Sequence, residues 1–584
     1  MGGIVYVDAD APGANNGSSW TDAYRSLVDA LAAATDGDEV RVAQGRYTPA
    51  AKTGEPLDRD VSFVLVDGVA LEGGYAGYGQ ADPNARDAAE YETILSGDSA
   101  GDDQPVDDPC ELMRSPWRSD NCYHVVNAST CDERTLIEGF TISGGQADGE
   151  GESARYGAGL LRGKPTVRQC RFICNAATYW GSAVYFDEQP YYSYEGGKLA
   201  QCVISRNFTG GGSAVEGCGQ ATECIFENNV VDNGSGAAMY FGNGQTGVLT
   251  DCTFSNNRVY YHGGVIRTQN GSPRFIRCTF VENRAGVRGG AVYLDGCGTC
   301  QESYPEFDRC KFVGNKAPDD GGAIYVGGNT HAKFVNCLIV GNESHSSGGG
   351  LCDAAYFGCV VENCTIADNK AVNCGAGIRI YRPYYTWYPQ QGLLLVNSIL
   401  WGNFMGTSRT FDSQLCLGED GSRATVSFNC IESLSTGCCN TGNINLDPLF
   451  ARPGYWDPRD YNDPDDDSYV DGDYHLKSRA GRWDPNSAQW VQDMVTSPCV
   501  DAGDPSTAAG PEPGPNGCRR NMGAYGGTTE ASKSPAAVPP CACGPSITGD
   551  INGDCRVDWL DFRLMAANWM QTVDAGQEPP GDDE

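Results

Sequence analysis

The chain carries too little positive charge for a nucleic-acid-binding protein. Its 584 residues include 41 Lys and Arg against 76 Asp and Glu, which gives a formal net charge of −35. Because such a surface repels phosphate groups, we exclude nucleic acid as a partner. The sequence also lacks an apolar run of the roughly 18 residues that a membrane-spanning helix needs. We therefore expect a soluble, secreted protein with no transmembrane segment.

Helical periodicity is equally scarce. Between residues 170 and 403, no segment has the length and the 3.6-residue spacing of an amphipathic helix. The apolar runs in this region are short, alternate with polar residues and end at Gly or Asn, which is typical of β-strands. Charged residues make up only 20% of the chain and Gly is abundant at 77, so the composition does not suit a coiled coil or a disordered chain.

One sequence motif is repeated nine times in this region. Each repeat begins with Cys and has Asn five residues later, followed by a short polar loop, small residues and an aliphatic residue. The cysteine column consists of Cys170, Cys202, Cys224, Cys252, Cys278, Cys310, Cys337, Cys364 and, in the last repeat, Ser398. The asparagine column consists of Asn175, Asn207, Asn229, Asn257, Asn283, Asn315, Asn342, Asn369 and Asn403. Self-similarity at 22 to 32 residues indicates a solenoid.

The residue types of the repeat predict which solenoid forms. Short strands with Asn and Gly at the corners favour a parallel β-helix, in which equivalent residues of successive coils stack about 4.8 Å apart. A column of Asn at one corner can pass amide hydrogen bonds from coil to coil. The small pair before the aliphatic residue, such as Gly289-Gly290, allows a tight turn. We expect the cysteine column to point inward as a stack of small apolar groups.

The array resembles the right-handed parallel β-helix proteins of the pectin-lyase type. Its segments Phe254–Asn257, Phe280–Asn283 and Phe312–Asn315, with Gly-Gly-Ala at 289–291 and 321–323, resemble the FxxN and GGA[ILV] repeats of polymorphic membrane proteins. The resemblance implies an all-β fold built as a right-handed solenoid. It does not specify an activity, because this fold hosts lyases, hydrolases, adhesins and scaffolds.

Residues 1–130 are expected to form an N-terminal cap and the first coils. A strand at Ile4–Asp8 precedes an amphipathic helix predicted over Thr21–Ala34, which would cover the open end of the solenoid. An irregular, Asp-rich insertion follows around Ala100–Asp120. Further strand pieces are predicted at Glu39–Val42, Phe63–Val66, Val69–Leu71 and Thr93–Leu95. The opening residues resemble those of a group of secreted bacterial β-helix proteins.

The remainder of the chain divides into four parts. Regular repeats occupy 131–405, the last coils and an acidic insertion 406–527, a linker 528–545 and a small tail 546–584. Two late coils are predicted around Thr425–Ile431 and Asn443–Phe450. The insertion from Asp457 to Asp473 contains eight Asp, which indicates either a calcium-bound loop or a solvated acidic loop.

The tail contains the sharpest metal motif. Oxygen ligands fall at positions 1, 3, 5, 9 and 12 of a calcium loop, with a backbone carbonyl at position 7. These residues are Asp550, Asn552, Asp554, Asp558 and Asp561, with Arg556 at position 7. With the helical spacing that follows, the segment resembles one half of a dockerin type I module. The resemblance implies calcium as cofactor and a cohesin-like or cell-surface partner, although Cys555 replaces the usual Gly at position 6. The alternative is a small stabilising tail.

The 27 cysteines indicate an oxidising compartment. Close pairs that suit disulfides are Cys110/Cys122, Cys499/Cys518 and Cys297/Cys300, and the last of these leaves a zinc site as an alternative. No signal peptide is visible at Met1, so we interpret the sequence as a mature form with a new start. We expect the protein to be extracellular or attached to the cell surface.

A charged strip formed by the loops after the Asn column is the candidate catalytic region. Stacked coils would bring together His262, Arg288, Asp319, Asp320 and His345. Glycoside hydrolysis requires two carboxylates at a set separation, whereas a lyase requires a base and a cation that neutralises a uronate. The alternative interpretation is an ordinary solvated surface strip.

A group of aromatic residues is the candidate recognition site. Tyr384, Tyr385, Trp387 and Tyr388 lie in one long excursion from the array, where flat rings can stack on sugars. The alternative is that this loop folds back and shields the solenoid. We expect a binding or scaffold protein that contacts polysaccharide and is attached through its calcium-dependent tail. The alternative function is an extracellular polysaccharide lyase or glycoside hydrolase.

Overall fold

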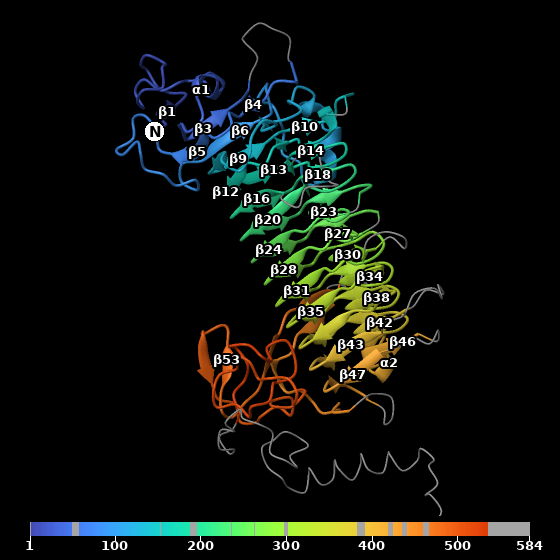
Figure 1. Cartoon of the computed structure of the whole chain (residues 1–584). Coiled ribbons are helices and arrows are strands. Elements are labelled where there is room, and N and C mark those ends of the chain that lie inside the picture. The colour runs from blue at the N-terminus through green and yellow to red at the C-terminus, as the bar shows by residue number, and fades with distance from the viewer. Residues whose placement is uncertain are drawn as a thin grey trace, which may run out of the picture.

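The computed structural model describes residues 2–49, 58–151, 153–186, 196–234, 236–261, 263–296, 302–381, 392–418, 424–434, 441–458 and 467–534. Over these residues the chain winds into a right-handed parallel β-helix, as the sequence predicts (Figure 1). Three long parallel sheets run along the solenoid and form its faces. Within the described residues, no helix is long and apolar enough to cross a membrane.

Sheet 1 has 14 described strands that pair in parallel. They are β1 (Ile4–Val7), β2 (Glu39–Ala43), β5 (Ala70–Tyr75), β8 (Leu136–Glu138), β12 (Thr166–Arg168), β16 (Gly197–Ala200), β20 (Cys218–Thr222), β24 (Val248–Thr250), β28 (Arg274–Ile276), β31 (Glu306–Asp308), β35 (Lys333–Val335), β39 (Val360–Glu362), β43 (Leu393–Val396) and β47 (Ala424–Ser427).

Sheet 2 has 13 described strands and follows sheet 1 in each coil. They are β3 (Gly45–Tyr47), β6 (Thr93–Ser96), β9 (Phe140–Ser143), β13 (Arg171–Ile173), β17 (Val203–Ser205), β21 (Ile225–Glu227), β25 (Thr253–Ser255), β29 (Thr279–Val281), β32 (Lys311–Val313), β36 (Leu338–Val340), β40 (Thr365–Ala367), β44 (Ile399–Trp401) and β48 (Cys430–Ile431).

Sheet 3 has 12 described strands and completes each coil. They are β4 (Phe63–Val64), β7 (Val126–Asn127), β11 (Leu160–Leu161), β15 (Val184–Tyr185), β19 (Val215–Glu216), β23 (Met239–Phe241), β27 (Ile266–Gln269), β30 (Val292–Asp295), β34 (Ile324–Gly328), β38 (Leu351–Ala355), β42 (Ile378–Ile380) and β46 (Leu415–Leu417).

Two short parallel strips bridge the corner between sheets 2 and 3. The first contains β10 (Gln146–Ala147), β14 (Ala176–Ala177), β18 (Phe208–Thr209), β22 (Val230–Val231) and β26 (Arg258–Val259). The second contains β33 (Lys316–Ala317), β37 (Glu343–Ser344), β41 (Lys370–Ala371) and β45 (Phe404–Met405). Each strand of these strips except β10, which follows Gly145, begins directly after a residue of the Asn column.

The Asn column forms the continuous hydrogen-bonded ladder that the sequence predicts. Nδ2 of Asn283 donates to Oδ1 of Asn315 at 3.0 Å and to the carbonyl of Phe254 at 2.9 Å. The backbone N–H of Asn283 donates to the same Oδ1 at 3.1 Å. The pattern continues to Asn403, whose Nδ2 donates to Oε1 of Gln414 at 2.7 Å. Buried amides therefore link every coil of the array to its neighbour.

The Cys column also points inward, as predicted. Each of its thiols is at most 1% exposed, and most donate to a carbonyl of the preceding coil, as Cys310 does to Phe275 at 3.5 Å. Stacked aromatic rings fill the core beside them. Centroids are 4.7 to 4.8 Å apart along a file that consists of Phe226, Phe254, Phe280 and Phe312. In each coil that contains it, the FxxN motif thus supplies one aromatic ring to the core and one side-chain amide to the Asn ladder.

A left-handed corner between sheets 1 and 2 was not predicted. The residue before each column cysteine has φ between 50 and 54°. These residues are Gln169, Gln201, Glu223, Asp251, Arg277, Arg309, Asn336, Asn363 and, before Ser398, Asn397. The conformation turns the chain within one residue, and three of the nine positions carry Asn, which tolerates it best among non-glycine residues.

The N-terminal helix is shorter than predicted. Helix α1 spans Leu27–Ala33 and starts after Ser26, whose side chain accepts the N–H of Asp29. The residues from Thr21 do not join the helix because the backbone of Tyr24 exchanges hydrogen bonds of 2.8 Å with Tyr6 and Asp8. The prediction over Thr21–Ala34 was wrong at its start, since these residues instead cover the free edge of β1.

Short 3-10 helices occur in the loops of the first coils. They are η1 (Pro109–Arg114), η2 (Pro116–Arg118) and η3 (Ser153–Arg155). The first two belong to the Asp-rich insertion that the sequence placed around Ala100–Asp120. Pro109 and Pro116 occupy their first turns, where the missing N–H has no cost.

The C-terminal end departs from the prediction of two late coils. The first exists as β47 and β48, followed by a single bridge between Cys430 and Ile444. The predicted coil Asn443–Phe450 forms only at its start, where Asn443 and Ile444 hydrogen-bond to the preceding coil. It does not continue, because β49 (Phe450–Arg452) pairs antiparallel with β52 (Asp473–Leu476). Helix α2 (Phe411–Gln414) precedes the last coil and supplies Gln414 to the ladder. Two further hairpins are β50 (Tyr455–Asp457) with β51 (Ser468–Val470), and β53 (Arg482–Asp484) with β54 (Gln489–Val491).

The strandless segment 497–534 folds back along the solenoid. Nδ2 of Asn363 donates to the carbonyl of Asn521 at 3.0 Å, and Nδ2 of Asn336 to that of Gly526 at 2.7 Å. Residues 528–534, predicted to begin the linker, also pack here, since Ala531 is fully buried and Ser532 is 4% exposed. The rest of the linker and the whole tail 546–584 lie outside the described residues.

The described part of the acidic insertion forms ion pairs with the solenoid. Asp467 lies 2.6 Å from Nζ of Lys370, and Asp471 contacts Lys311. The same lysine, Lys370, lies over the ring of Trp456 at 4.3 Å. These carboxylates are therefore used to dock the hairpin β50–β51, and residues 459–466 lie outside the described part.

Replacement of Asn283 by alanine should destabilise the β-helix by about 3 kcal/mol or more. The change removes the acceptor of the Asn257 N–H, one of the two acceptors of Asn257 Nδ2 and the Asn283 amide donor to the carbonyl of Phe254. Each buried polar group that loses its partner costs roughly 1–3 kcal/mol. Thermal and urea unfolding followed by circular dichroism would measure the loss. The exposed Asn373→Ala is the matched control and should change stability little. Equal unfolding midpoints for Asn283→Ala and Asn373→Ala would contradict the stabilising role of the Asn ladder.

Candidate functional site

The outer face of sheet 3 carries one continuous file of polar and aromatic side chains. Strand register joins these positions, and the residue before each of them is fully or almost fully buried in the core. The file consists of Tyr185, Glu216, Tyr240, Arg267, Tyr293, Tyr325, Cys352, Arg379 and Cys416. Because the coils are in register, these side chains lie side by side along the solenoid.

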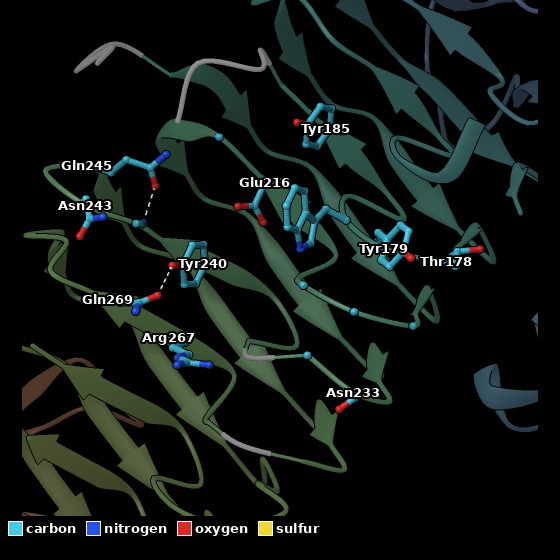
Figure 2. A pocket seen from close by; sticks show the side chains of 17 residues that line it. Thr178, Tyr179, Tyr185, Glu216, Asn233, Tyr240, Asn243, Gln245, Arg267 and Gln269 are labelled. Atoms are coloured by element: carbon cyan, nitrogen blue, oxygen red, sulfur yellow. Dashed lines mark hydrogen bonds between the residues drawn. The ribbon is translucent and has the colours of Figure 1, made fainter. Parts of the chain in front are cut away.

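A cavity of about 470 Å³ opens over the first half of this file (Figure 2). Its floor is formed by Tyr185, Glu216, Tyr240 and Arg267, which follow one another down the sheet. One wall comes from the loops between the corner strip and sheet 3, and the other from the ends of β23 and β27. The wall residues are Thr178, Tyr179, Trp180, Gly210, Gly211, Gly212, Gly217, Asn233, Gly234, Gly242, Asn243, Gln245 and Gln269. We call this cavity the sheet 3 groove.

Stacked aromatic rings form one end of the groove. The ring of Tyr156 lies 5.3 Å from Trp180 at an interplanar angle of 14° and 5.4 Å from Tyr185 at 21°. Trp180 and Tyr179 nevertheless remain 43% and 41% exposed, so each keeps a face toward solvent. Gly212 is required here, because a Cβ at this position would lie 1.6 Å from Cδ1 of Trp180. The result is a fixed, partly exposed aromatic platform.

Glu216 is the titratable group at the centre of the floor. Its Oε2 accepts a hydrogen bond from Oγ of Ser213 at 2.6 Å. Burial raises the pKa of this carboxyl to about 7, and the Ser213 hydrogen bond offsets only part of that effect. Near neutral pH the group is therefore divided between a proton donor and an acceptor.

Amide and phenol groups complete the polar lining. Oη of Tyr240 donates to Oε1 of Gln269 at 2.9 Å, and the N–H of Gly242 donates to Oε1 of Gln245 at 2.7 Å. The two amide carbonyls are held by these bonds, so each amide presents an oriented NH2 group. Arg267 lies over the ring of Tyr293 at 5.5 Å, where the groove passes to the next coil.

The charged strip predicted from the sequence adjoins the other half of the same file. Nε of Arg288 lies 2.8 Å from Asp319, and its guanidinium stacks on Tyr325 at 5.0 Å. Asp320 instead accepts hydrogen bonds from Ser346 at 2.9 Å and Ser347 at 3.2 Å. His345 is exposed on the next coil, with its N–H bonded to the carbonyl of Ala317 at 3.1 Å. The loops stack as predicted, but the side chains of Arg288, Asp319 and Asp320 are used in ion pairs and in hydrogen bonds of the turns.

Several predicted site residues cannot be placed. His262 lies outside the described residues, as do the aromatic residues Tyr384, Tyr385, Trp387 and Tyr388. The calcium-loop residues Asp550, Asn552, Asp554, Arg556, Asp558 and Asp561 also lie there. These assignments stay predictions.

The predicted disulfide pairs are not joined where the structure describes them. Sγ of Cys110 lies 3.7 Å from Oη of Tyr260, whereas Sγ of Cys122 donates to the carbonyl of His124 at 3.2 Å. Cys499 is fully buried and shares a hydrogen bond with Cys430. The pair Cys297/Cys300 lies outside the described residues.

One group of carboxylates could hold a metal ion among the described residues. Oxygens of Asp98, Asp102 and Asp120 lie within 4.8 Å of one another in the Asp-rich insertion. Asp98 already accepts the N–H groups of Gly101 at 2.7 Å and Asp102 at 3.2 Å. It also pairs with Arg46 at 2.6 Å. Because these bonds occupy the oxygens, we interpret the cluster as a hydrogen-bonded turn.

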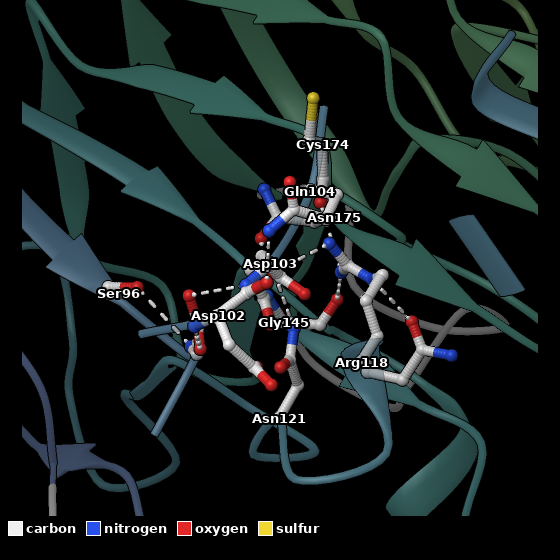
Figure 3. Close-up of polar contacts among 12 residues, drawn as sticks. Ser96, Asp102, Asp103, Gln104, Arg118, Asn121, Gly145, Cys174 and Asn175 are labelled. Atoms are coloured by element: carbon white, nitrogen blue, oxygen red, sulfur yellow. Dashed lines mark hydrogen bonds and ion pairs between the residues drawn. The ribbon is translucent and has the colours of Figure 1, made fainter. Parts of the chain in front are cut away.

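The same insertion is anchored by a buried arginine (Figure 3). Arg118 is 4% exposed and donates to Asp103 at 3.2 Å and to the carbonyls of Gly145 and Cys174 at 3.0 and 3.1 Å. Nδ2 of Asn121 also donates to Asp103, at 2.9 Å. These contacts fix the insertion against the first strip strands and give it a structural role.

A second hollow of about 630 Å³ lies between sheets 1 and 2 and the closing segment. Its basic residues are Arg277, Arg309 and Lys311, which pair with Asp251, Asp308 and Asp471. Since these cations are already neutralised by neighbours, the sheet 3 groove is the stronger candidate site.

Two family models match parts of the chain. The right handed beta helix region model matches residues 191–352, and the disaggregatase related model matches residues 330–503. No curated protein matches the sequence. Each family model covers less than half of the chain, and the first agrees with the fold described above.

Several solved structures match the chain at low similarity. Pectate lyase Pel9A is 12% identical, with 90% of this chain and 96% of that chain covered and a TM-score of 0.32. A rhamnogalacturonan lyase is 13% identical, with coverages of 77% and 91% and a TM-score of 0.32. The PL6 family alginate lyase AlyGC is 12% identical, with coverages of 71% and 52% and a TM-score of 0.36. At these TM-scores the matches carry no argument, and the fold assignment rests on the strand pairing described above.

The groove residues were missed although the sequence contains a signal for them. Each follows the aliphatic residue that comes after the small pair of its repeat, as Tyr293 follows Val292. Alternation along a strand places that position outward. Aligning the repeats one residue beyond the aliphatic position would have collected Tyr185, Glu216, Tyr240, Arg267, Tyr293 and Tyr325 as one file.

Glu216→Gln should flatten part of the pH dependence of stability. The folded-state pKa is raised to about 7 from 4.5, so between these values the folded protein holds a proton that the unfolded chain has released. Stability from this group is present below about pH 4.5 and falls as the pH rises toward about 7. Wild type should therefore lose more thermal stability between pH 5 and pH 8 than the variant does.

The exposed Glu223→Gln serves as the control for this measurement, because it also removes a carboxylate and should keep the wild-type profile. If the wild-type and Glu216→Gln proteins lose the same stability over this range, Glu216 does not have the raised pKa.

Proposed function

We propose that this β-helix is a secreted or cell-surface protein that binds a polysaccharide chain in the sheet 3 groove. The observation that carries the proposal is the pair of exposed rings, Tyr179 and Trp180, that pack on Tyr156 at one end of a polar cavity. Partly exposed aromatic faces suit the apolar faces of sugar rings, as they suit other flat or ring-shaped groups. The cavity is within the size range of small-ligand sites.

The polar lining supports a ligand rich in hydroxyl groups. Gln245 and Gln269 are held by hydrogen bonds through their carbonyl oxygens and so present donors, while Glu216 can donate or accept near neutral pH. Asn233 and Asn243 add further donors and acceptors on opposite walls. A repeating chain of sugars can meet such groups repeatedly, because the coils repeat along the groove.

Hydrolysis of the bound chain is less well supported. Among the described residues that line the groove, Glu216 is the one carboxylate. The next on the outward face of sheet 3 is Asp295 of β30, three strands from β19 and therefore roughly 14 Å away. This exceeds the separation of up to about 9.5 Å that an inverting pair requires. Binding without cleavage is the better account, and a lyase or hydrolase is the alternative that the experiment below distinguishes.

We also propose that the C-terminal tail binds calcium and attaches the protein to a cohesin-like or other cell-surface partner. The support is the ligand spacing from Asp550 to Asp561 and the resemblance to half of a dockerin type I module. The docked segment up to Ser534 would hold the solenoid end, and residues 535–545 would then act as the linker.

Trp180→Ala should weaken polysaccharide binding by about tenfold or more. Truncation of an aromatic hot-spot residue commonly costs about 2 kcal/mol or more, and each 1.4 kcal/mol corresponds to tenfold. Affinity electrophoresis and calorimetry with neutral and acidic polysaccharides, with calcium present, would measure binding. Trp117→Ala is the matched control, because Trp117 is 49% exposed and lies outside the groove.

Equal affinities of the two variants would contradict groove binding. New reducing ends, or the ultraviolet absorbance of an unsaturated uronate, would instead establish the enzymatic alternative.

Asp550→Ala combined with Asp554→Ala should remove one calcium site from the full chain. Both carboxylates occupy early positions of the loop, and their charges are needed to hold the ion. Calorimetric titration of the metal-free protein with calcium would count the sites. Asp574→Ala removes a tail carboxylate outside the calcium-loop spacing and should leave the number of sites unchanged. If the double variant loses no calcium site, the calcium assignment is wrong.

A further inference from the structure

The far end of the outward file of sheet 3 carries a pair of thiols bound by one guanidinium. Nη1 of Arg379 lies 2.8 Å from Sγ of Cys374 and 2.9 Å from Sγ of Cys416. Arg379 and Cys416 are register partners on β42 and β46, and Cys374 lies in the turn just before β42. The two thiols also share a hydrogen bond. They come from segments whose backbones touch, since the N–H of Gly375 donates to the carbonyl of Asp412 at 2.8 Å.

The two cysteines are not equivalent. Cys374 is partly exposed at the surface of the turn, whereas Cys416 is only 8% exposed. The hydrogen bond from Cys416 and the charge of Arg379 lower the pKa of Cys374 to about 6, against the burial that raises it. The same hydrogen bond, with burial, raises the pKa of Cys416. An accessible thiolate beside a protected thiol is the arrangement of an attacking and a resolving cysteine.

This arrangement differs from the other cysteines of the array. The column cysteines are enclosed in the core and donate to backbone carbonyls, so no oxidant reaches them. Cys352 is a neighbour of Arg379 in the same file but is 1% exposed. A guanidinium bound to both sulfurs also disfavours a metal cation there, because it would repel the ion.

We propose that Cys374 and Cys416 form a thiol–disulfide exchange site that closes a disulfide across the last coils of the solenoid. This inference is independent of the groove function. The oxidant is a small-molecule disulfide such as oxidised glutathione. The Cys374 thiolate attacks one sulfur of it, the S–S bond of the oxidant breaks, and one thiolate leaves.

The second step uses the protected thiol. Cys416 loses its proton to solvent and attacks Sγ of Cys374, which releases the second small thiolate and forms the Cys374–Cys416 bond. Two protein thiols are oxidised and one small disulfide is reduced to two thiols, so electrons balance. The bond would join the turn before β42 to β46 and hold the terminal coil closed.

Graded oxidation of the full-length, fully reduced protein tests the proposal. The protein is equilibrated with mixtures of reduced and oxidised glutathione, quenched in acid, alkylated and mapped by mass spectrometry. The Cys374–Cys416 peptide should appear at a more reducing ratio than any other crosslink. In Cys416→Ser, a mixed disulfide with glutathione should accumulate on Cys374, whereas Cys352→Ser should behave as wild type. Absence of the crosslink, or equal mixed disulfide with and without Cys416, would overturn the proposal.

The role of Arg379 is tested by the pH profile of alkylation. In the wild type, iodoacetamide should modify Cys374 with a midpoint well below that of an ordinary thiol. Arg379→Gln should slow the reaction several-fold at pH 6.5 but not at pH 9.5, and Arg379→Lys should restore part of the rate. If the alkylation of Cys374 in the wild type has its pH midpoint in the range of an ordinary thiol, the proposed exchange site is wrong, whatever the variants show.

Discussion

The amide hydrogen bond between stacked asparagines is the contact on which the rest of the structure depends. Each ladder residue from Asn207 to Asn369 receives two donors from the coil before it and gives two to the coil after it, all with buried partners, as Asn283 does. A slip of one residue in any coil would break these bonds and turn its outward side chains into the core. The ladder therefore fixes the register of all three sheets at once.

Fixed register explains why chemistry gathers in files on the outside of the solenoid. Tyr185, Glu216 and Tyr240 come from three different coils, yet they form one floor because each occupies the same place in its repeat. The groove is closed by loops that differ from coil to coil, such as Thr178–Trp180 and Gly210–Gly212. The framework is thus repetitive and the specificity lies in the loops, which a solenoid tolerates because its core does not depend on them.

The repeat made the β-helix, the inward cysteines and the Asn ladder predictable from sequence, because each depends on residues at one recurring position. The failures occur where tertiary contacts override a local pattern. The stretch from Thr21 has helical spacing, but the backbone of Tyr24 completes the edge of β1 instead. Residues 443–450 have a strand-like composition, but β49 pairs with β52 because the segment 473–476 returns beside it. The groove was missed for another reason: its residues differ in type, and only their shared position reveals them.

The distribution of charge in the molecule is one basis of the proposed binding role. Although the chain has a net charge of −35, the described acidic groups are largely used in structural contacts, such as Asp467 with Lys370 and Asp319 with Arg288. The groove keeps one buried carboxyl, Glu216, without a second carboxylate at hydrolytic distance among the described lining residues. A single carboxyl with a pKa near 7 can exchange a hydrogen bond with a sugar hydroxyl in either direction, but it cannot serve as both acid and nucleophile. The proposal of a binding surface therefore rests on the arrangement of charge and not on the fold, which hosts both binding proteins and enzymes.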